Sequence, residues 1–143
     1  MKWVRLVATG MAWAVVYNGL WLLAWITFMR REWTEAAGAS GESMPWTLEF
    51  WAVWIPVTVA FGFAVGGHLL SRPADDDTRR AAWAASLVIW VPGTIGMAFV
   101  PGLTPRIMVL DGVVNLVAVL VASLVVTGGM GRLLGPDASE NTP

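Results

Sequence analysis

Few side chains in this sequence could do chemistry, and most of them lie inside long apolar runs. Asp111 precedes Asn115 by four residues, so the two share one face if the segment is helical. A second amide, Asn18, lies near the middle of another apolar run. Because an unpaired amide is costly in hydrocarbon, we expect Asn18 and Asn115 to hydrogen-bond to each other as structural partners rather than to bind a ligand.

The carboxylic acid Asp111 has two interpretations. An ionisable group within a membrane indicates a functional site by default, because a charge there costs at least about 2.5 kcal/mol. Alternatively, a helix begins at Asp111 and the residue caps it, or its carboxylate pairs with Arg106 or with Arg30 and Arg31. We expect the cap or the ion pair, either of which places the acid near the outer surface of the membrane.

The pattern Trp-x-Pro-x-Thr occurs twice, from Trp54 to Thr58 and from Trp90 to Thr94. Both prolines fall near the middle of an apolar run, where each removes a backbone hydrogen bond and should kink the helix. The threonine that follows can bond to nearby backbone groups. The bend either shapes a closed bundle, which we expect, or opens a broken-helix binding site of the kind found in transporters.

His68 is the one histidine, and the sequence contains no cysteine. Thiolate metal sites and disulfides within the chain are therefore excluded, and one histidine cannot complete a zinc site or a two-histidine haem site. A single axial bond from His68 to a haem or chlorin stays open, with Gly66 and Gly67 leaving room for the ring. We expect instead a histidine at the interface with water. No nucleophile motif accompanies it, so we expect no enzyme, no cofactor and no resident metal.

The composition is that of a membrane protein. Of the 143 residues, 57% are hydrophobic and 13% are charged, against about 25% charged in soluble domains. Four runs are almost free of charge, and each is long enough to cross a bilayer, which takes roughly 20 apolar residues. These runs are Leu6 to Met29, Trp51 to Leu70, Ala81 to Pro105 and Gly112 to Gly131. The net charge of −1 is uninformative about nucleic acid, but the sequence has no basic patch to bind it, so we expect no nucleic-acid partner.

The runs predict an all-α fold, a four-helix transmembrane bundle of two antiparallel hairpins with its second and third helices kinked at proline. We expect one domain, 1–134, with helices at about 3–29, 46–70, 81–100 and 106–128. A flexible Ala/Gly/Ser segment is expected from Thr34 to Ser43, and a disordered cytoplasmic tail over 135–143. Lys and Arg number six on the side of the two termini and three on the other, so both termini are expected in the cytoplasm.

The ten tryptophans fall into two groups. One group lies near predicted helix ends, where aromatic rings favour the headgroup level; it comprises Trp3, Trp33, Trp46 and Trp83. The other forms a stripe along the first helix at every fourth position; it comprises Trp13, Tyr17, Trp21 and Trp25. The stripe could receive a flat ligand or pack against a neighbour. We expect packing, against the small residues of Gly62-x-x-x-Gly66 and Ala60-x-x-x-Ala64 on the second helix.

The short basic start, with Lys2 and Arg5, and the amide Asn18 in the first helix resemble small four-helix integral membrane proteins of unassigned function in GC-rich bacteria. The resemblance covers the length of the chain and implies no activity. We expect a multi-pass protein of the bacterial plasma (inner) membrane, in contact with the lipid bilayer.

The expected role is structural or accessory, as a subunit of a larger membrane complex or as a homo-oligomer. The alternative is a binder or small transporter of a lipophilic ligand, such as a quinone, carotenoid, pigment or lipid, held between the helices. Its candidate site comprises Tyr17, Asn18, Trp54, Thr58, Trp90, Thr94, Asp111 and Asn115.

Overall fold

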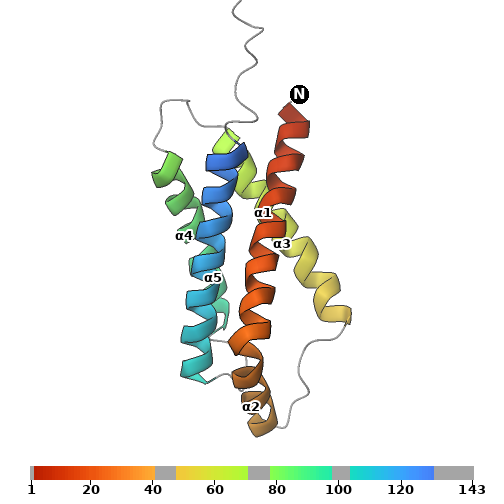
Figure 1. The fold of residues 1–143 in the computed structure, drawn as a ribbon, viewed down its shortest axis with the longest axis vertical. Coiled ribbons are helices and arrows are strands. Elements are labelled where there is room, and N and C mark those ends of the chain that lie inside the picture. The colour runs from red at the N-terminus through yellow and green to blue at the C-terminus, as the bar shows by residue number, and fades with distance from the viewer. Residues whose placement is uncertain (1, 41–47, 71–77, 98–103, 131–143) are drawn as a thin grey trace, which may run out of the picture.

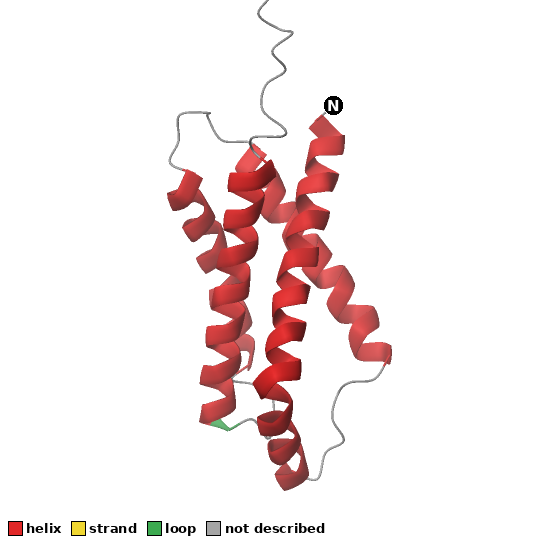
Figure 2. Cartoon of the chain, viewed as in Figure 1, coloured by secondary structure: helices red, strands yellow, loops and turns green. Residues whose placement is uncertain are grey.

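Helices make up nearly all of the structure. The computed structural model describes residues 2–40, 48–70, 78–97 and 104–130 (Figure 2). α1 spans Lys2–Ala24 and continues through a π-helical segment, Trp25–Met29, into α2, Arg30–Ser40. α3 spans Leu48–Leu70, α4 spans Thr78–Met97, and α5 spans Pro105–Val125 before a second π-helical segment, Val126–Met130. The prediction of four packed helices in an all-α chain is confirmed, with α1 and α2 forming one continuous helical stretch.

α1 makes most of the contacts between helices. It packs against α3 and α5, and α5 in turn packs against α4 (Figure 1). The first turns of α3 stand away from the other helices in Figure 1, and its later turns cross α1. Pro56 and Pro92 lie inside α3 and α4 and are exposed on the outside of the bundle. Bending at these prolines and the pairing of the helices into two hairpins stay predictions.

The crossing of α1 and α3 depends on glycine. A Cβ added to Gly62 would lie 2.3 Å from the carbonyl oxygen of Gly10, and a Cβ on Gly66 would lie 3.2 Å from the methyl of Thr9. The two backbones therefore approach directly, as small residues four apart permit in membranes. The expectation that Gly62 and Gly66 receive the aromatic stripe of α1 is wrong, because these glycines receive Gly10 and Thr9 instead.

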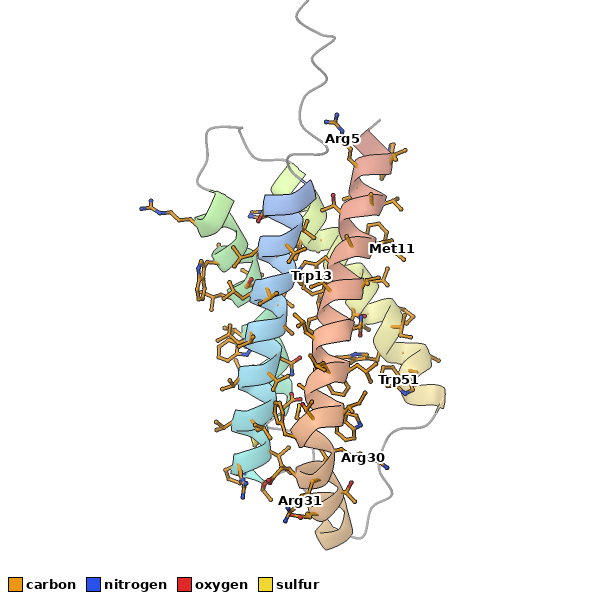
Figure 3. The ribbon with its side chains drawn as sticks, in the orientation of Figure 1. Arg5, Met11, Trp13, Arg30, Arg31 and Trp51 are labelled. Atoms are coloured by element: carbon orange, nitrogen blue, oxygen red, sulfur yellow. The ribbon has the colours of Figure 1, made fainter. Side chains whose placement is uncertain are left out.

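The aromatic stripe packs inside the bundle, against other aromatic rings. Trp13 stacks on Tyr17 with ring centroids 5.1 Å apart, and Trp21 stacks on Trp25 at 5.8 Å. Trp21 also meets Trp54 of α3, with centroids 6.1 Å apart. Figure 3 shows Trp13 on the side of α1 that faces α5 and Met11 on another side. Packing was the expected role of the stripe. Tyr17 and Trp21 contact Trp54 of α3, and Trp13 contacts Ser123 of α5.

The outer surface of the bundle is rich in large apolar side chains. They lie on α1, α3, α4 and α5, whereas five polar or charged side chains among the described residues are buried beside the apolar core. The buried polar residues are Thr9, Thr58, Ser86, Asp111 and Ser123. An apolar exterior around a partly polar interior suits hydrocarbon, where exposed apolar groups cost nothing and polar groups must find partners inside the protein.

Three helical stretches are long and apolar enough to cross a membrane, namely Trp3–Glu35, Trp51–His68 and Pro105–Gly128. α4 contributes a shorter apolar stretch, Trp83–Ile95. Four spans were expected. Within the described residues, three stretches are candidate spans, and the apolar part of α4 is shorter than a span requires.

The first span is longer than a bilayer requires. At about 1.5 Å per residue, its 33 residues extend about 50 Å, whereas the hydrocarbon core is about 30 Å thick. Figure 3 shows Arg5 at one end of this stretch and Arg30 and Arg31 towards the other. The helix continues to Ser40, so the flexible segment expected from Thr34 is helical as far as the structure describes it. The expected tail, 135–143, lies outside the described residues.

Candidate functional site

A cavity of about 120 Å³ lies among α1, α3, α4 and α5, and seven of the eight candidate site residues line it. Each helix supplies part of the set. The seven residues are Tyr17 from α1, Trp54 and Thr58 from α3, Trp90 and Thr94 from α4, and Asp111 and Asn115 from α5. Asn18 is the one candidate that does not line the cavity. The structure therefore brings together residues that are up to about a hundred positions apart in the sequence.

Asp111 is the charged residue of the cavity, and it is 5% exposed. α5 begins at Pro105, and Thr104 is its N-cap, accepting a hydrogen bond from the backbone N–H of Ile107 at 3.4 Å. Asp111 therefore lies well inside the helix, and its predicted role as a cap is wrong.

The predicted ion pair of Asp111 is also wrong. Arg106 bonds to Glu32 at 2.7 Å, and Arg31 bonds to Glu35 at 2.8 Å. No Lys, Arg or His among the described residues forms a salt bridge with Asp111. The buried-acid interpretation, which the sequence left as the alternative, is the one that the structure adopts.

A chain of hydrogen bonds connects α1 to the acid. The Tyr17 hydroxyl donates to Oδ1 of Asn115, and Nδ2 of Asn115 donates to Oδ2 of Asp111 at 2.7 Å. The same amide nitrogen donates to the backbone carbonyl of Asp111 at 2.9 Å. Asn115 thus uses both ends of its amide and holds the carboxylate at a fixed position beside Tyr17.

Asn18 has a different partner from the predicted one. Its Nδ2 donates to Thr58 Oγ1 at 3.0 Å and to the backbone carbonyl of Ala14 at 2.8 Å. Thr58 in turn donates to the carbonyl of Ile55 at 3.0 Å. The predicted bond between Asn18 and Asn115 is therefore wrong: one amide connects α1 to α3, and the other connects α1 to α5.

The two Trp-x-Pro-x-Thr patterns face the cavity from opposite helices. Trp54 and Thr58 line it from α3, and Trp90 and Thr94 line it from α4. The indole N–H of Trp90 donates to the backbone carbonyl of Gly112 at 2.6 Å, and this bond fixes the ring against α5. A Cβ on Gly112 would lie 3.5 Å from the methyl of Thr94. This is an ordinary contact distance, so Thr94 of α4 lies against α5 next to Asp111.

Five lining residues were not among the candidates from the sequence. Trp13, Phe61, Ile89, Gly93 and Val119 complete the wall of the cavity. Trp13 could be inferred from the aromatic stripe, but the others are ordinary residues of an apolar helix. Their role depends on which helix faces meet, and no local pattern indicates that.

A second polar contact adjoins the cavity and holds three helices together. The indole N–H of Trp13 donates to the hydroxyl of Ser123 at 3.1 Å, and the Ser86 hydroxyl donates to Ser123 at 3.3 Å. All three side chains are fully buried. This contact involves no charged group, so it satisfies its polar atoms without an ion.

His68 lines a separate and more open cavity. This cavity measures about 240 Å³ and is bounded by small and apolar residues of α3 and α4, including Val65, Ala84 and Ala85. His68 itself is exposed. Among the described residues, no group of three or more His, Cys, Asp or Glu side chains lies close enough together to hold a metal ion.

Comparison with known proteins identified no relative of this chain. No family model matches the chain, and neither a curated protein nor a solved structure does. The likeness to small bacterial four-helix proteins therefore stays a prediction from the sequence.

The arrangement can bind but offers little for covalent chemistry. A carboxyl group, two amide or hydroxyl partners and several aromatic rings surround a space that is large enough for a few non-hydrogen atoms. Among the described residues, Asp111 has hydrogen-bond partners but no salt-bridge partner. The burial of a charged carboxylate is repaid only when an opposite charge is close.

Proposed function

We propose that this small helical membrane protein binds a small ligand in the cavity among α1, α3, α4 and α5, as a carrier or sensor of that ligand within the membrane. The observation that carries the proposal is the burial of Asp111, 5% exposed, in the wall of that cavity. A charge in hydrocarbon costs at least about 2.5 kcal/mol. A purely structural role would not offset this free-energy cost.

The volume of the cavity limits the ligand. A cavity of about 150 Å³ holds benzene, and this one measures about 120 Å³. Sites for drug-sized ligands are roughly 300–1,000 Å³. A quinone, carotenoid or pigment is therefore too large to be enclosed, and the proposed ligand is smaller than those that the sequence suggested.

A binding role is proposed in preference to catalysis. Asp111 is the one acid that lines the cavity among the described residues, and His68 lines the separate cavity between α3 and α4. A hydroxyl nucleophile normally needs a general base within hydrogen-bond reach. The hydroxyl of Thr58 donates to the carbonyl of Ile55 and that of Tyr17 to Asn115, not to Asp111.

The accessory role is the second candidate, and the groove that contains His68 favours it. Ala64, Ala84 and Ala85 line this groove between α3 and α4. Small residues let the backbone of another membrane helix approach closely. A partner protein would therefore be expected on that side of the bundle.

The experiment compares two matched variants of α5 after purification from native membranes. Val119→Phe adds a ring to a buried residue in the cavity wall, whereas Val117→Phe adds the same ring to an exposed residue of the same helix. Mass spectrometry then identifies the small molecules and proteins that co-purify with each variant.

A small molecule retained by the wild type and by Val117→Phe, but lost from Val119→Phe, supports binding in the cavity. A stoichiometric protein partner, with no small molecule that depends on Val119, supports the accessory role instead. The fold of each variant is checked by far-UV circular dichroism, so that loss of a ligand is not mistaken for loss of structure.

A further inference from the structure

The charged and polar groups of the cavity wall favour one sign of charge in a ligand. None of the described residues that line it carries a positive charge, whereas Asp111 supplies a carboxyl group and Asn115 holds that group in place. Thr94 and Thr58 add hydroxyl oxygens. Such a wall favours a ligand that brings a positive charge.

Aromatic rings from three helices form the rest of the wall. Trp13 and Tyr17 come from α1, Trp54 from α3 and Trp90 from α4. Tyr17 is held by stacking on Trp13 with an interplanar angle of 7°, and Trp54 is tilted by 36° to Tyr17 with centroids 6.4 Å apart. An aromatic ring attracts a cation that lies over its face, because the face of the ring is negative.

We propose, on the basis of the binding role proposed above, that the ligand is a small alkylammonium ion. Asp111 is its counterion, and Tyr17, Trp54 and Trp90 form an aromatic cage around its methyl or methylene groups. The volume admits an ion of about five non-hydrogen atoms, since a slightly larger cavity holds benzene. Such an ion would place a positive charge beside Asp111, which none of the described residues of the cavity wall supplies.

A metal ion fits this wall less well. Hard cations such as Ca²⁺ take six to eight oxygen ligands, and the described residues contain no cluster of three or more potential metal ligands of the His, Cys, Asp and Glu types. Aromatic faces replace the hydration shell of an alkylammonium ion, whose charge is spread over its methyl groups, better than that of a compact metal ion.

The test uses two probes of the same size. Tetramethylammonium chloride carries the charge, and tert-butanol has the same number of non-hydrogen atoms but is neutral. Each is titrated into the full chain in lipid nanodiscs, at a constant ionic strength set with sodium chloride, with isothermal calorimetry and tryptophan fluorescence as readouts. The variants are Asp111→Asn, which keeps the shape of the side chain, Val119→Phe, which fills the cavity, and Glu35→Gln, which removes an exposed acid on α2.

We expect saturable binding of tetramethylammonium and none of tert-butanol. Asp111→Asn should weaken the binding roughly 100-fold or more, as the loss of one partner of a buried ion pair does. Val119→Phe should abolish it, and Glu35→Gln should leave it unchanged. If Asp111→Asn does not fold, the comparison of the two probes and the Val119→Phe variant still decide the question.

Three results would overturn the inference. Equal binding of both probes, or full binding by a folded Asp111→Asn variant, would show that the cavity binds a ligand without regard to charge, which leaves the proposed binding role intact. No binding of tetramethylammonium would exclude the alkylammonium ligand. The binding role itself would then be judged by whether any small molecule is retained in a way that depends on Val119.

Discussion

Replacing Gly62 by alanine should force α1 and α3 apart. The new Cβ would lie 2.3 Å from the carbonyl oxygen of Gly10, whereas an ordinary contact begins near 3.4 Å. Because the obstructing atom belongs to the backbone, one helix must move by about 1 Å, and such overpacking costs about 1–3 kcal/mol. Alanine also stabilises a helix by about 0.4–1 kcal/mol through the unfolded state, so the clash has to be measured against a second glycine substitution.

Gly67→Ala provides the matched control on the same helix. A Cβ there would lie 3.8 Å from the nearest atom, a methyl group of Leu6, which is an ordinary contact. Unfolding in mixed micelles, followed by far-UV circular dichroism as denaturing detergent is added, gives the free energy of unfolding for each variant. We expect Gly62→Ala to be less stable than Gly67→Ala by about 1–3 kcal/mol. Equal stability of the two variants would refute the backbone contact between α1 and α3.

Three further predictions follow from the polar contacts and from the charge distribution. A double-mutant cycle with Asn18→Leu and Thr58→Val should show a coupling between a few tenths and about 1.7 kcal/mol in the free energy of unfolding; additive effects would contradict the bond between these side chains. Trp13→Phe removes the donor to Ser123 and should cost at least about 1 kcal/mol in the same assay, and an unchanged stability would count against that contact. Reporter fusions after Arg80 and at the C-terminus should both report cytoplasm, and an exterior signal from either would reverse the orientation.

The helices were predictable because hydrophobic composition over about 20 residues indicates a membrane segment whatever its neighbours do. Helix ends depend on weaker signals. The stretch after Thr34 contains Gly38 and Ser40 and was expected to be flexible, but it also contains three alanines, and alanine is the strongest helix former. α4 differs from the expectation for another reason: its described apolar part, Trp83–Ile95, is shorter than the charge-free run that contains it.

The candidate residues were predictable as a set, but not as pairs. Polar residues in the middle of apolar runs are expected to face the interior of the bundle, and the candidate set built on them and on nearby aromatic residues contains seven of the residues that line the cavity. Which of them meet depends on the rotation of each helix about its axis. Consecutive residues of an α-helix point about 100° apart, so Tyr17 reaches Asn115 on α5 while its neighbour Asn18 reaches Thr58 on α3.

The depth of Asp111 was accessible from the sequence. Thr104 and Pro105 form a favourable start for a helix, with threonine as the cap and proline in the first turn. Given that start, Asp111 is nearly two turns inside the helix, too far along to act as its cap. The Arg106 side chain at the start of α5 is then directed to Glu32 on α2 rather than to Asp111.

Other polar contacts inside the bundle use neutral side chains, so the acidic side chain at position 111 needs an explanation of its own. Trp13 with Ser123, and Asn18 with Thr58, connect α1 to its neighbours through groups that carry no charge. An asparagine at position 111 could offer an acceptor to Asn115 just as well, without the cost of at least about 2.5 kcal/mol for a charge in hydrocarbon. The hydrogen bonding of the site thus explains a polar residue at this position but not an acidic one, and the acid is explained if the cavity beside it receives a positive charge.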